Sequence, residues 1–253
     1  MMLKDRKLLV ILSTLICCLL FLSTGLINAQ SASEIMNQVD EYQYLKSAKV
    51  ESKMIITKGP RKMVKEMTSY IKGGKYGLTK FTNPRDRGSK FLKRDENLWM
   101  FFPDAEDIVK ISGHMLEQGM MGSDFSYQDL MESTKLTDLY QFEIIGEEQI
   151  GERICYVIEG IKKEGQEASY YRRKEWVDKE RFVLLKEKLY ARSGRLLKEL
   201  TTKEVKKLED RWYPTHQVID NKLKKNSQTS YKVEKIEFNL NVPESTFSLS
   251  RLR

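Results

Sequence analysis

Few residues of this chain have the types and spacing that catalysis or metal binding would need. The two histidines, His114 and His216, have neither a second imidazole nor a cysteine at metal-ligand spacing. The acidic residues at 104–107 and 147–148 could act as acid and base or bind calcium, but turn acids are usually solvated. No nucleophile elbow, catalytic-triad spacing, phosphate loop or dinucleotide fingerprint occurs. The sequence therefore predicts no enzyme, no metal site and no cofactor.

The side chains that stand out are apolar. The strand-like run 98–102 is apolar on both faces, whereas a strand with one solvated face should alternate polar and apolar residues. A methionine-rich loop follows at 115–125. Because methionine is flexible, this loop could cover one face of the strand and adapt to an apolar guest. The combination predicts a binding site for an apolar ligand.

We expect the hydrophobic lining of this site to come from the sheet and from the loop above it. The expected ligand-binding residues are Met54, Ile56, Trp99 and Phe101 on the sheet and Met115, Leu116, Met120, Met121 and Phe125 in the loop. The pattern does not fix which face of 98–102 is concave. Leu98, Met100 and Phe102 therefore remain the alternative to Trp99 and Phe101.

The elements that must position these residues are mostly strands. Residues 31–44 predict a helix, capped by Ser31 with Glu34 three positions later. Residues 112–137 break the strand rhythm and predict one or two short helices, with a second capping box at Ser126 and Asp129. Strand-like runs occur at 50–56, 63–71, 76–81, 90–93, 98–102, 107–111, 141–147, 153–161, 169–177, 182–191, 195–206, 212–221 and 229–238.

Regular spacing and short links predict that neighbouring strands pair in sequence and antiparallel. No long helix separates them, which excludes a doubly wound parallel sheet. We expect a mainly β (α+β) fold with one large curved antiparallel sheet of about ten or eleven strands, a half-open barrel. The N-terminal helix and short lid helices should lie on its concave side. Residues 30–253 should form one domain.

The first residues predict an export signal. A positively charged start precedes the apolar run 8–22, and Ala29 offers a small residue at a cleavage point. We expect a signal peptide at 1–29 and a periplasmic location. A retained anchor is disfavoured because the run is short for a membrane span. Lipidation at Cys17 or Cys18 is disfavoured by the bulky residues before them.

The chain has a formal net charge of +8, but its basic residues are scattered among acids. With export, this argues against nucleic acid as a partner. The densest basic run, 170–174, could contact acidic lipid head groups. We favour the alternative, that these residues lie on the solvent-exposed outer face of a sheet. Cys155 is the one cysteine that would remain after cleavage, so no internal disulfide is expected. We expect Cys155 to be a small buried residue.

The central sequence GSKFLKRDENLWMFFPDAEDIVKISG, followed by MMGSDFSYQDL, resembles the LolA-like outer membrane lipoprotein-sorting protein family, in a branch of uncertain cargo. The matching motifs are 98–103, 110–112 and 121–130, and weaker matches follow in order at 151–157, 176–178, 193–198 and 211–215. The buried arginine that holds the lid closed in better-studied members is not placed by the sequence. The MGSDFSY motif is also not characteristic of those members.

The resemblance implies a half-open antiparallel barrel with an apolar concave side and a helical lid. It also implies a periplasmic, non-enzymatic carrier or chaperone that shields the acyl chains of a lipoprotein or membrane lipid. An inner-membrane transporter and an outer-membrane acceptor would then be partners. The alternative is an accessory or scaffold subunit of an envelope lipid transporter, with a filled core. It predicts that charge reversal at Arg172 and Arg173 breaks a complex while Met120→Asp is tolerated.

Overall fold

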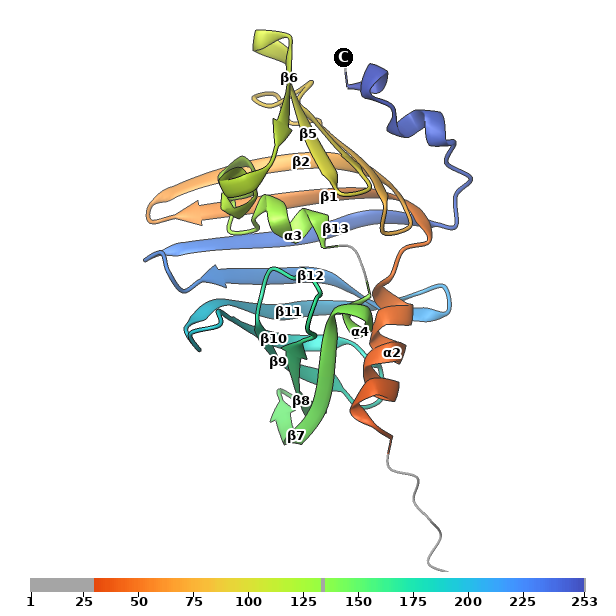
Figure 1. Cartoon of the computed structure of the whole chain (residues 1–253), viewed down its shortest axis with the longest axis vertical. Coiled ribbons are helices and arrows are strands. Elements are labelled where there is room, and N and C mark those ends of the chain that lie inside the picture. Colours follow the sequence, from red (N-terminus) through yellow and green to blue (C-terminus); the bar gives the residue numbers. More distant parts are fainter. Residues whose placement is uncertain (1–29, 133–134, 253) are drawn as a thin grey trace, which may run out of the picture. The chain divides into compact units, whose positions relative to one another are not determined.

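The computed structural model describes residues 30–132 and 135–252, so the expected signal peptide at 1–29 lies outside the described residues. The chain from Ser31 onward forms a compact unit by itself. Within the described residues its framework is one antiparallel sheet of 13 strands, in the order β6-β5-β4-β3-β2-β1-β13-β12-β11-β10-β9-β8-β7 (Figure 1). The single-sheet, mainly β fold is confirmed, with more strands than the ten or eleven expected.

The strand bounds follow the period-two runs of the sequence closely. The strands are β1 (Ser47–Lys58), β2 (Arg61–Lys72), β3 (Tyr76–Phe81), β4 (Lys90–Arg94), β5 (Asn97–Phe102), β6 (Asp107–Ile111), β7 (Tyr140–Ile150), β8 (Arg153–Lys162), β9 (Arg172–Asp178), β10 (Leu184–Tyr190), β11 (Leu196–Leu208), β12 (Arg211–Asn221) and β13 (Ser227–Phe238).

The sheet consists of two meanders joined at one seam. Strands β1 to β6 pair in sequence, and so do β7 to β13. The first and last strands then pair with each other, which places Met54 opposite Tyr231. In the described part of the chain, β6 and β7 remain as edges, so the sheet stays half open.

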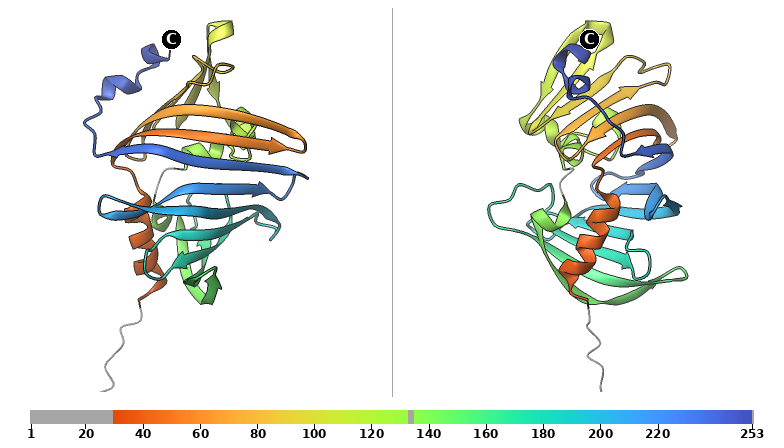
Figure 2. Two further views of the ribbon diagram at one scale, coloured as in Figure 1. Left: turned by 180° about the vertical axis from the view of Figure 1, so that it is seen from behind. Right: turned by 90° about the vertical axis from the view of Figure 1, so that its right-hand side faces the viewer.

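One face of the sheet, which we call the inner face, carries the helices (Figures 1 and 2). In β1 every second side chain from Ala48 to Ile56 is buried on this face. The register shifts after Glu51, Ile144 and Leu189. Such irregularities add an unpaired residue to one strand and increase its bend and twist. They help the sheet to curl around the helices.

Helix α2 (Ala32–Gln43) begins at the predicted capping box. The Ser31 Oγ accepts a hydrogen bond from the Glu34 amide at 3.2 Å, and the Ser31 amide donates to the Glu34 carboxylate at 2.8 Å. Ile35 and Val39, one turn apart, are completely buried against β8, β9 and β10. The helix therefore covers the inner face of the second meander.

The segment between the edge strands β6 and β7 crosses the inner face. It contains η2 (Gly113–Glu117), η3 (Met120–Gly122), α3 (Tyr127–Met131) and α4 (Leu136–Leu139). We call residues 112–132 the lid. The predicted capping box is present at the start of α3, where the Ser126 amide donates to Asp129 Oδ2 at 2.7 Å and the Asp129 amide donates to Ser126 Oγ at 3.2 Å.

The opposite, outer face of the first meander is covered by the C-terminal segment. After β13 the chain forms η4 (Glu244–Phe247) and η5 (Leu249–Arg251). Phe247 and Leu252 are buried against Leu78 of β3 and Leu92 of β4. Strand β5 thus has an apolar cover on each side, the lid within and the C-terminal segment outside, which explains why it is apolar on both faces.

Candidate binding site

The lid packs on the inner face of the first meander. Met54 of β1, Met100 of β5, Met120 of η3 and Tyr127 of α3 belong to one buried cluster. The lid residues that pack against it while staying partly buried are Leu116, Met121, Phe125, Leu130 and Met131. Ile56, two residues along β1 from Met54, is also completely buried. The structure therefore brings most of the expected lining residues together.

Two of the expected lining residues lie on the wrong side. Trp99 and Phe101 pack on the outer face, against the cluster formed by the C-terminal segment. Of the alternative set, Leu98 and Met100 pack in the inner-face cluster, and Phe102 is 38% exposed. Because side chains of a strand alternate and both faces of this one are apolar, its sequence alone could not decide between them. Met115 is the expected lid residue with the largest exposed fraction, 36% of its surface.

Two adjoining pockets lie beneath the lid. The first has a volume of about 200 Å³, and its apolar lining comprises Met54, Met67, Met120, Leu130 and Tyr231. The second, of about 330 Å³, extends toward α2 and the second meander, where its floor includes Leu189, Leu200 and Ile219. Phe125 and Asp129 of the lid line both pockets. The second pocket has the size of a small-molecule site.

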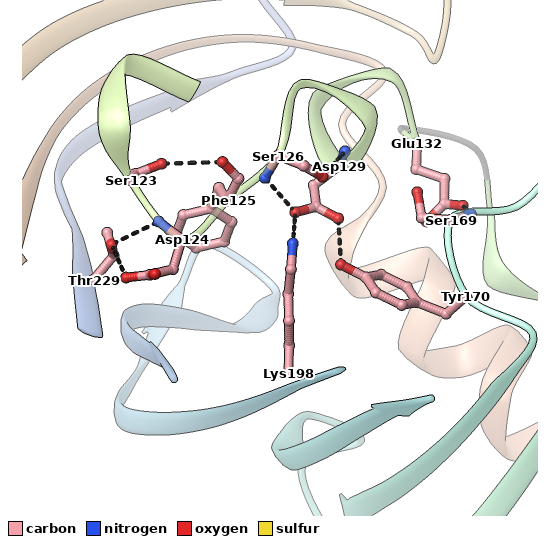
Figure 3. A network of polar contacts seen from close by, with 10 residues as sticks. All are labelled: Ser123, Asp124, Phe125, Ser126, Asp129, Glu132, Ser169, Tyr170, Lys198 and Thr229. Atoms are coloured by element: carbon pink, nitrogen blue, oxygen red, sulfur yellow. Dashed lines mark hydrogen bonds and ion pairs between the residues drawn. The ribbon is translucent and has the colours of Figure 1, made fainter. Parts of the chain in front are cut away.

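A carboxylate stands where the two pockets meet. Asp129 Oδ2 accepts hydrogen bonds from the Ser126 amide at 2.7 Å and from the Lys198 ammonium of β11 at 2.6 Å (Figure 3). Its other oxygen accepts from the Tyr170 hydroxyl at 2.6 Å. Charge-assisted hydrogen bonds of this length are strong. Asp129 therefore ties the lid to the second meander.

A second lid carboxylate is bound to the seam strand. The Asp124 amide donates to Thr229 Oγ1 at 2.9 Å, and the Thr229 hydroxyl donates to the Asp124 carboxylate at 2.8 Å (Figure 3). The Ser227 hydroxyl, also of β13, donates to the same carboxylate at 2.6 Å. Both Asp124 and Thr229 are almost completely buried. This motif anchors the middle of the lid to the sheet.

The C-terminal end of the lid is also fixed. The Lys93 ammonium of β4 donates to the carbonyl oxygen of Met131 at 2.7 Å and to that of Gly74 at 2.6 Å. Burial lowers the pKa of Lys93 to about 8. The Glu132 carboxylate accepts from the Ser169 amide, and burial raises the pKa of Glu132. Lysines of both meanders, Lys93 and Lys198, thus bind acceptors of the lid.

Arg173 lies on the inner face, which corrects its expected place on the wet outer face. Its side chain is 7% exposed and binds the carboxylates of Glu175 at 2.5 Å and Glu187 at 2.6 Å. Glu175 and Glu187 stand opposite each other on β9 and β10. Burial raises the pKa of Glu175 to about 7, an effect that Arg173 opposes. Arg172, in contrast, is half-buried and binds Glu159 at 2.7 Å.

Sequence reasoning missed the polar part of the site, which consists of Asp129, Tyr170, Arg173 and Lys198. Asp129 was recognised only as a capping residue. The available signal for Lys198 was its spacing of two from the apolar Leu200, which places both side chains on one face of a strand. That signal becomes specific only when the strand register shows Lys198 beside the lid.

Within 30–132 and 135–252, no three His, Cys, Asp or Glu side chains are grouped so that they could hold a metal ion. Over the same residues, no helix has the length and apolar character needed to cross a membrane. Cys155 is buried, and burial raises its thiol pKa to about 11.

A family model described as "uncharacterized protein" matches residues 73–253. No curated protein matches the chain. Among solved structures, a DUF1329 family protein from Desulfovibrio piger aligns with a TM-score of 0.80 and 24% identity, covering 88% of this chain and 98% of that one.

Two further solved structures share this fold. A putative outer membrane lipoprotein-sorting protein domain from Vibrio parahaemolyticus has a TM-score of 0.75 at 24% identity, over 87% of this chain and 97% of that one. A LolA superfamily protein from Nitrosomonas europaea has a TM-score of 0.74 at 21% identity, over 88% of this chain and 100% of that one. The chain therefore belongs to the family of uncharacterized proteins that this model describes, and its fold is that of the LolA-like outer membrane lipoprotein-sorting proteins.

Proposed function

We propose that this protein is a periplasmic carrier or chaperone that shields acyl chains of a lipoprotein or lipid beneath its lid. The observation that carries the proposal is the apolar pocket of about 200 Å³ between Met54 and Met67 of the sheet and Met120 of the lid. Each methylene group left in water costs ~0.8 kcal/mol, so a long acyl chain needs cover to cross an aqueous space. Flexible methionines suit a cover that must change shape with its cargo.

The LolA-like fold supports this function and the cellular place that goes with it. The role requires export by the segment 1–29 and needs no chemistry on the cargo. It also requires a donor and an acceptor, for which an inner-membrane transporter and an outer-membrane receptor are the partners we propose. The binding residues would be Met54, Met67, Met120, Phe125 and Leu130, which line the pocket.

Two measurements test the proposal. Lipid extraction of protein purified from cells, followed by mass spectrometry, should reveal a co-purifying acyl lipid. The delipidated protein should bind N-phenyl-1-naphthylamine, a neutral apolar dye that fluoresces away from water. Met120→Asp places a charge in the pocket and should weaken dye binding at least about tenfold.

The matched control is Leu223→Asp, because Leu223 is 50% exposed in the turn between β12 and β13. This control should leave dye binding unchanged. A protein with neither co-purifying lipid nor dye binding would contradict the carrier role. It would leave the accessory or scaffold subunit as the better interpretation.

A further inference from the structure

Lys198 is a buried cation whose carboxylate partner belongs to the lid. Its side chain is 11% exposed, and its ammonium lies 2.6 Å from Asp129 Oδ2. The Tyr170 ring centroid is 5.5 Å from the same ammonium, and the Tyr170 hydroxyl donates to the other oxygen of Asp129. A buried charge that loses its partner is strongly destabilising. If cargo displaces the Asp129 carboxylate while the site stays covered from water, an anion of the cargo must therefore take its place.

The position of this carboxylate matters for what could replace it. Asp129 lines both pockets, with Leu130 on the side of the first and Leu200 and Ile219 in the second. A molecule whose anionic group sat at this point could place a hydrocarbon tail in either pocket. The site thus combines one polar anchor with apolar space on each side of it.

We infer that Lys198 and Tyr170 form a subsite for the anionic head group of the cargo, and that Asp129 occupies this subsite while the lid is closed. The inference rests on the proposed function and specifies its cargo as an acyl amphiphile with a carboxylate or phosphate head. Such a head accepts the same two hydrogen bonds that Asp129 accepts from Lys198 and Tyr170. A neutral or cationic head would leave the Lys198 charge buried without an anion.

Arg173, another buried cation near the pockets, does not meet this requirement. Its partners Glu175 and Glu187 lie on the sheet and do not move with the lid. The carboxylate partner of Lys198 belongs to the lid and moves with it.

The test uses four amphiphiles with one tail: laurate, dodecyl phosphate, dodecanol and dodecyltrimethylammonium. Each competes with N-phenyl-1-naphthylamine for the delipidated protein at pH 8, where laurate is ionised. We expect laurate or dodecyl phosphate to bind at least about tenfold more tightly than dodecanol, the effect of one charge-assisted hydrogen bond. Whichever of laurate and dodecyl phosphate binds more tightly shows whether the subsite prefers the carboxylate of a fatty acid or the phosphate of a phospholipid. Equal binding of the four amphiphiles, or a preference for dodecanol or for the cation, would overturn the inference.

Variants separate the subsite from the general positive charge of the protein. Lys198→Gln should abolish the preference for anionic heads, and Lys198→Arg should restore it. Lys206→Gln, at a 55% exposed position of the same strand, should retain it. Asp129→Asn removes the internal anion and should tighten binding of the preferred anionic amphiphile.

The series on the unaltered protein decides the question even where a variant does not fold. Absence of both dye binding and co-purifying lipid would refute the carrier function itself. Dye binding with no head-group preference would refute only the anionic subsite.

Discussion

Asp129 Oδ2 lies 2.6 Å from the Nζ of Lys198, although the two residues are 69 positions apart in the chain. Asp129 belongs to the lid, whose apolar side chains pack on the first meander, whereas Lys198 belongs to the second meander. The lid is therefore held by apolar packing on one half of the sheet and by an ion pair on the other. This division lets polar and apolar contacts of the lid be altered separately.

Lys198→Met should loosen the lid without unfolding the sheet. It leaves the Asp129 carboxylate with two neutral donors in a largely buried place, which should lower the free energy of lid opening by about 1–3 kcal/mol. Hydrogen exchange of the amides at 124–131 should become faster, while exchange in β12 and β13 stays unchanged. Lys206→Met is the control. Unaltered exchange at 124–131 would show that the ion pair does not hold the lid.

Glu175 should make stability depend on pH. Its folded pKa is raised from 4.5 to about 7. Between these values the folded protein keeps a proton that the unfolded chain has released, so stability falls as pH rises through this interval. Glu175→Gln is uncharged throughout and should avoid this fall. By pH 8 the free energy of unfolding of Glu175→Gln should exceed that of the unaltered protein by on the order of 2 kcal/mol.

Urea unfolding of both proteins at several values between pH 4 and 8 measures this difference. Glu199→Gln, on the same sheet but less buried, should retain the pH dependence of the unaltered protein. If the unfolding free energies of the unaltered protein and of Glu175→Gln changed with pH in parallel, the folded protein would not hold a proton at Glu175.

Met54→Ala and Trp99→Ala should separate binding from stability. Both remove a large apolar side chain packed in a cluster, and each should cost about 2–5 kcal/mol of unfolding free energy. Met54 lines the pocket, so its loss should change the dissociation constant of the dye by at least about threefold. Trp99 packs on the outer face, so its loss should leave that constant unchanged. A reversed result would place the binding site on the outer face.

Asp40→Ala should detach α4 from α2. The buried Asp40 carboxylate accepts from the amides of Leu136 and Thr137 at 2.8 and 2.9 Å, and from the Thr137 hydroxyl at 2.7 Å. Without the carboxylate, these three hydrogen-bond donors lose their acceptor. The free energy of unfolding, measured by heat or urea, should fall by about 2–4 kcal/mol. Glu41→Ala, at an exposed position of the same helix, should change stability little.

The architecture could be predicted because strand alternation and turns are local signals. Each period-two run became a strand, and both capping boxes formed where Ser31 and Ser126 indicated. The size of the sheet was underestimated because ten strands is a typical limit for an open, twisted sheet. Register shifts such as that after Glu51 increase bending, and a sheet that curls can continue further.

The site could be predicted in composition but not in full geometry. Met54 and Met120 were proposed as lining residues from their type and from their expected places in a strand and in the lid, and the structure packs both in one buried cluster. The face of Trp99 depends on the C-terminal segment, whose residue Phe247 covers it from a distant part of the sequence. Arg173 was misplaced because a run of basic residues looks solvated until its alternation is matched to the neighbouring strands.

The pairing of β1 with β13 has a consequence for how the molecule is made. The ribosome produces β13 after every other strand described here, so the seam cannot form until synthesis is nearly complete. Each half can fold earlier as a chain of hairpins, but Met54 acquires its neighbour Tyr231 only at the end. A chain interrupted before Ser227 would expose the β1 edge and lack the anchor for Asp124, so the cavity cannot be completed without β13.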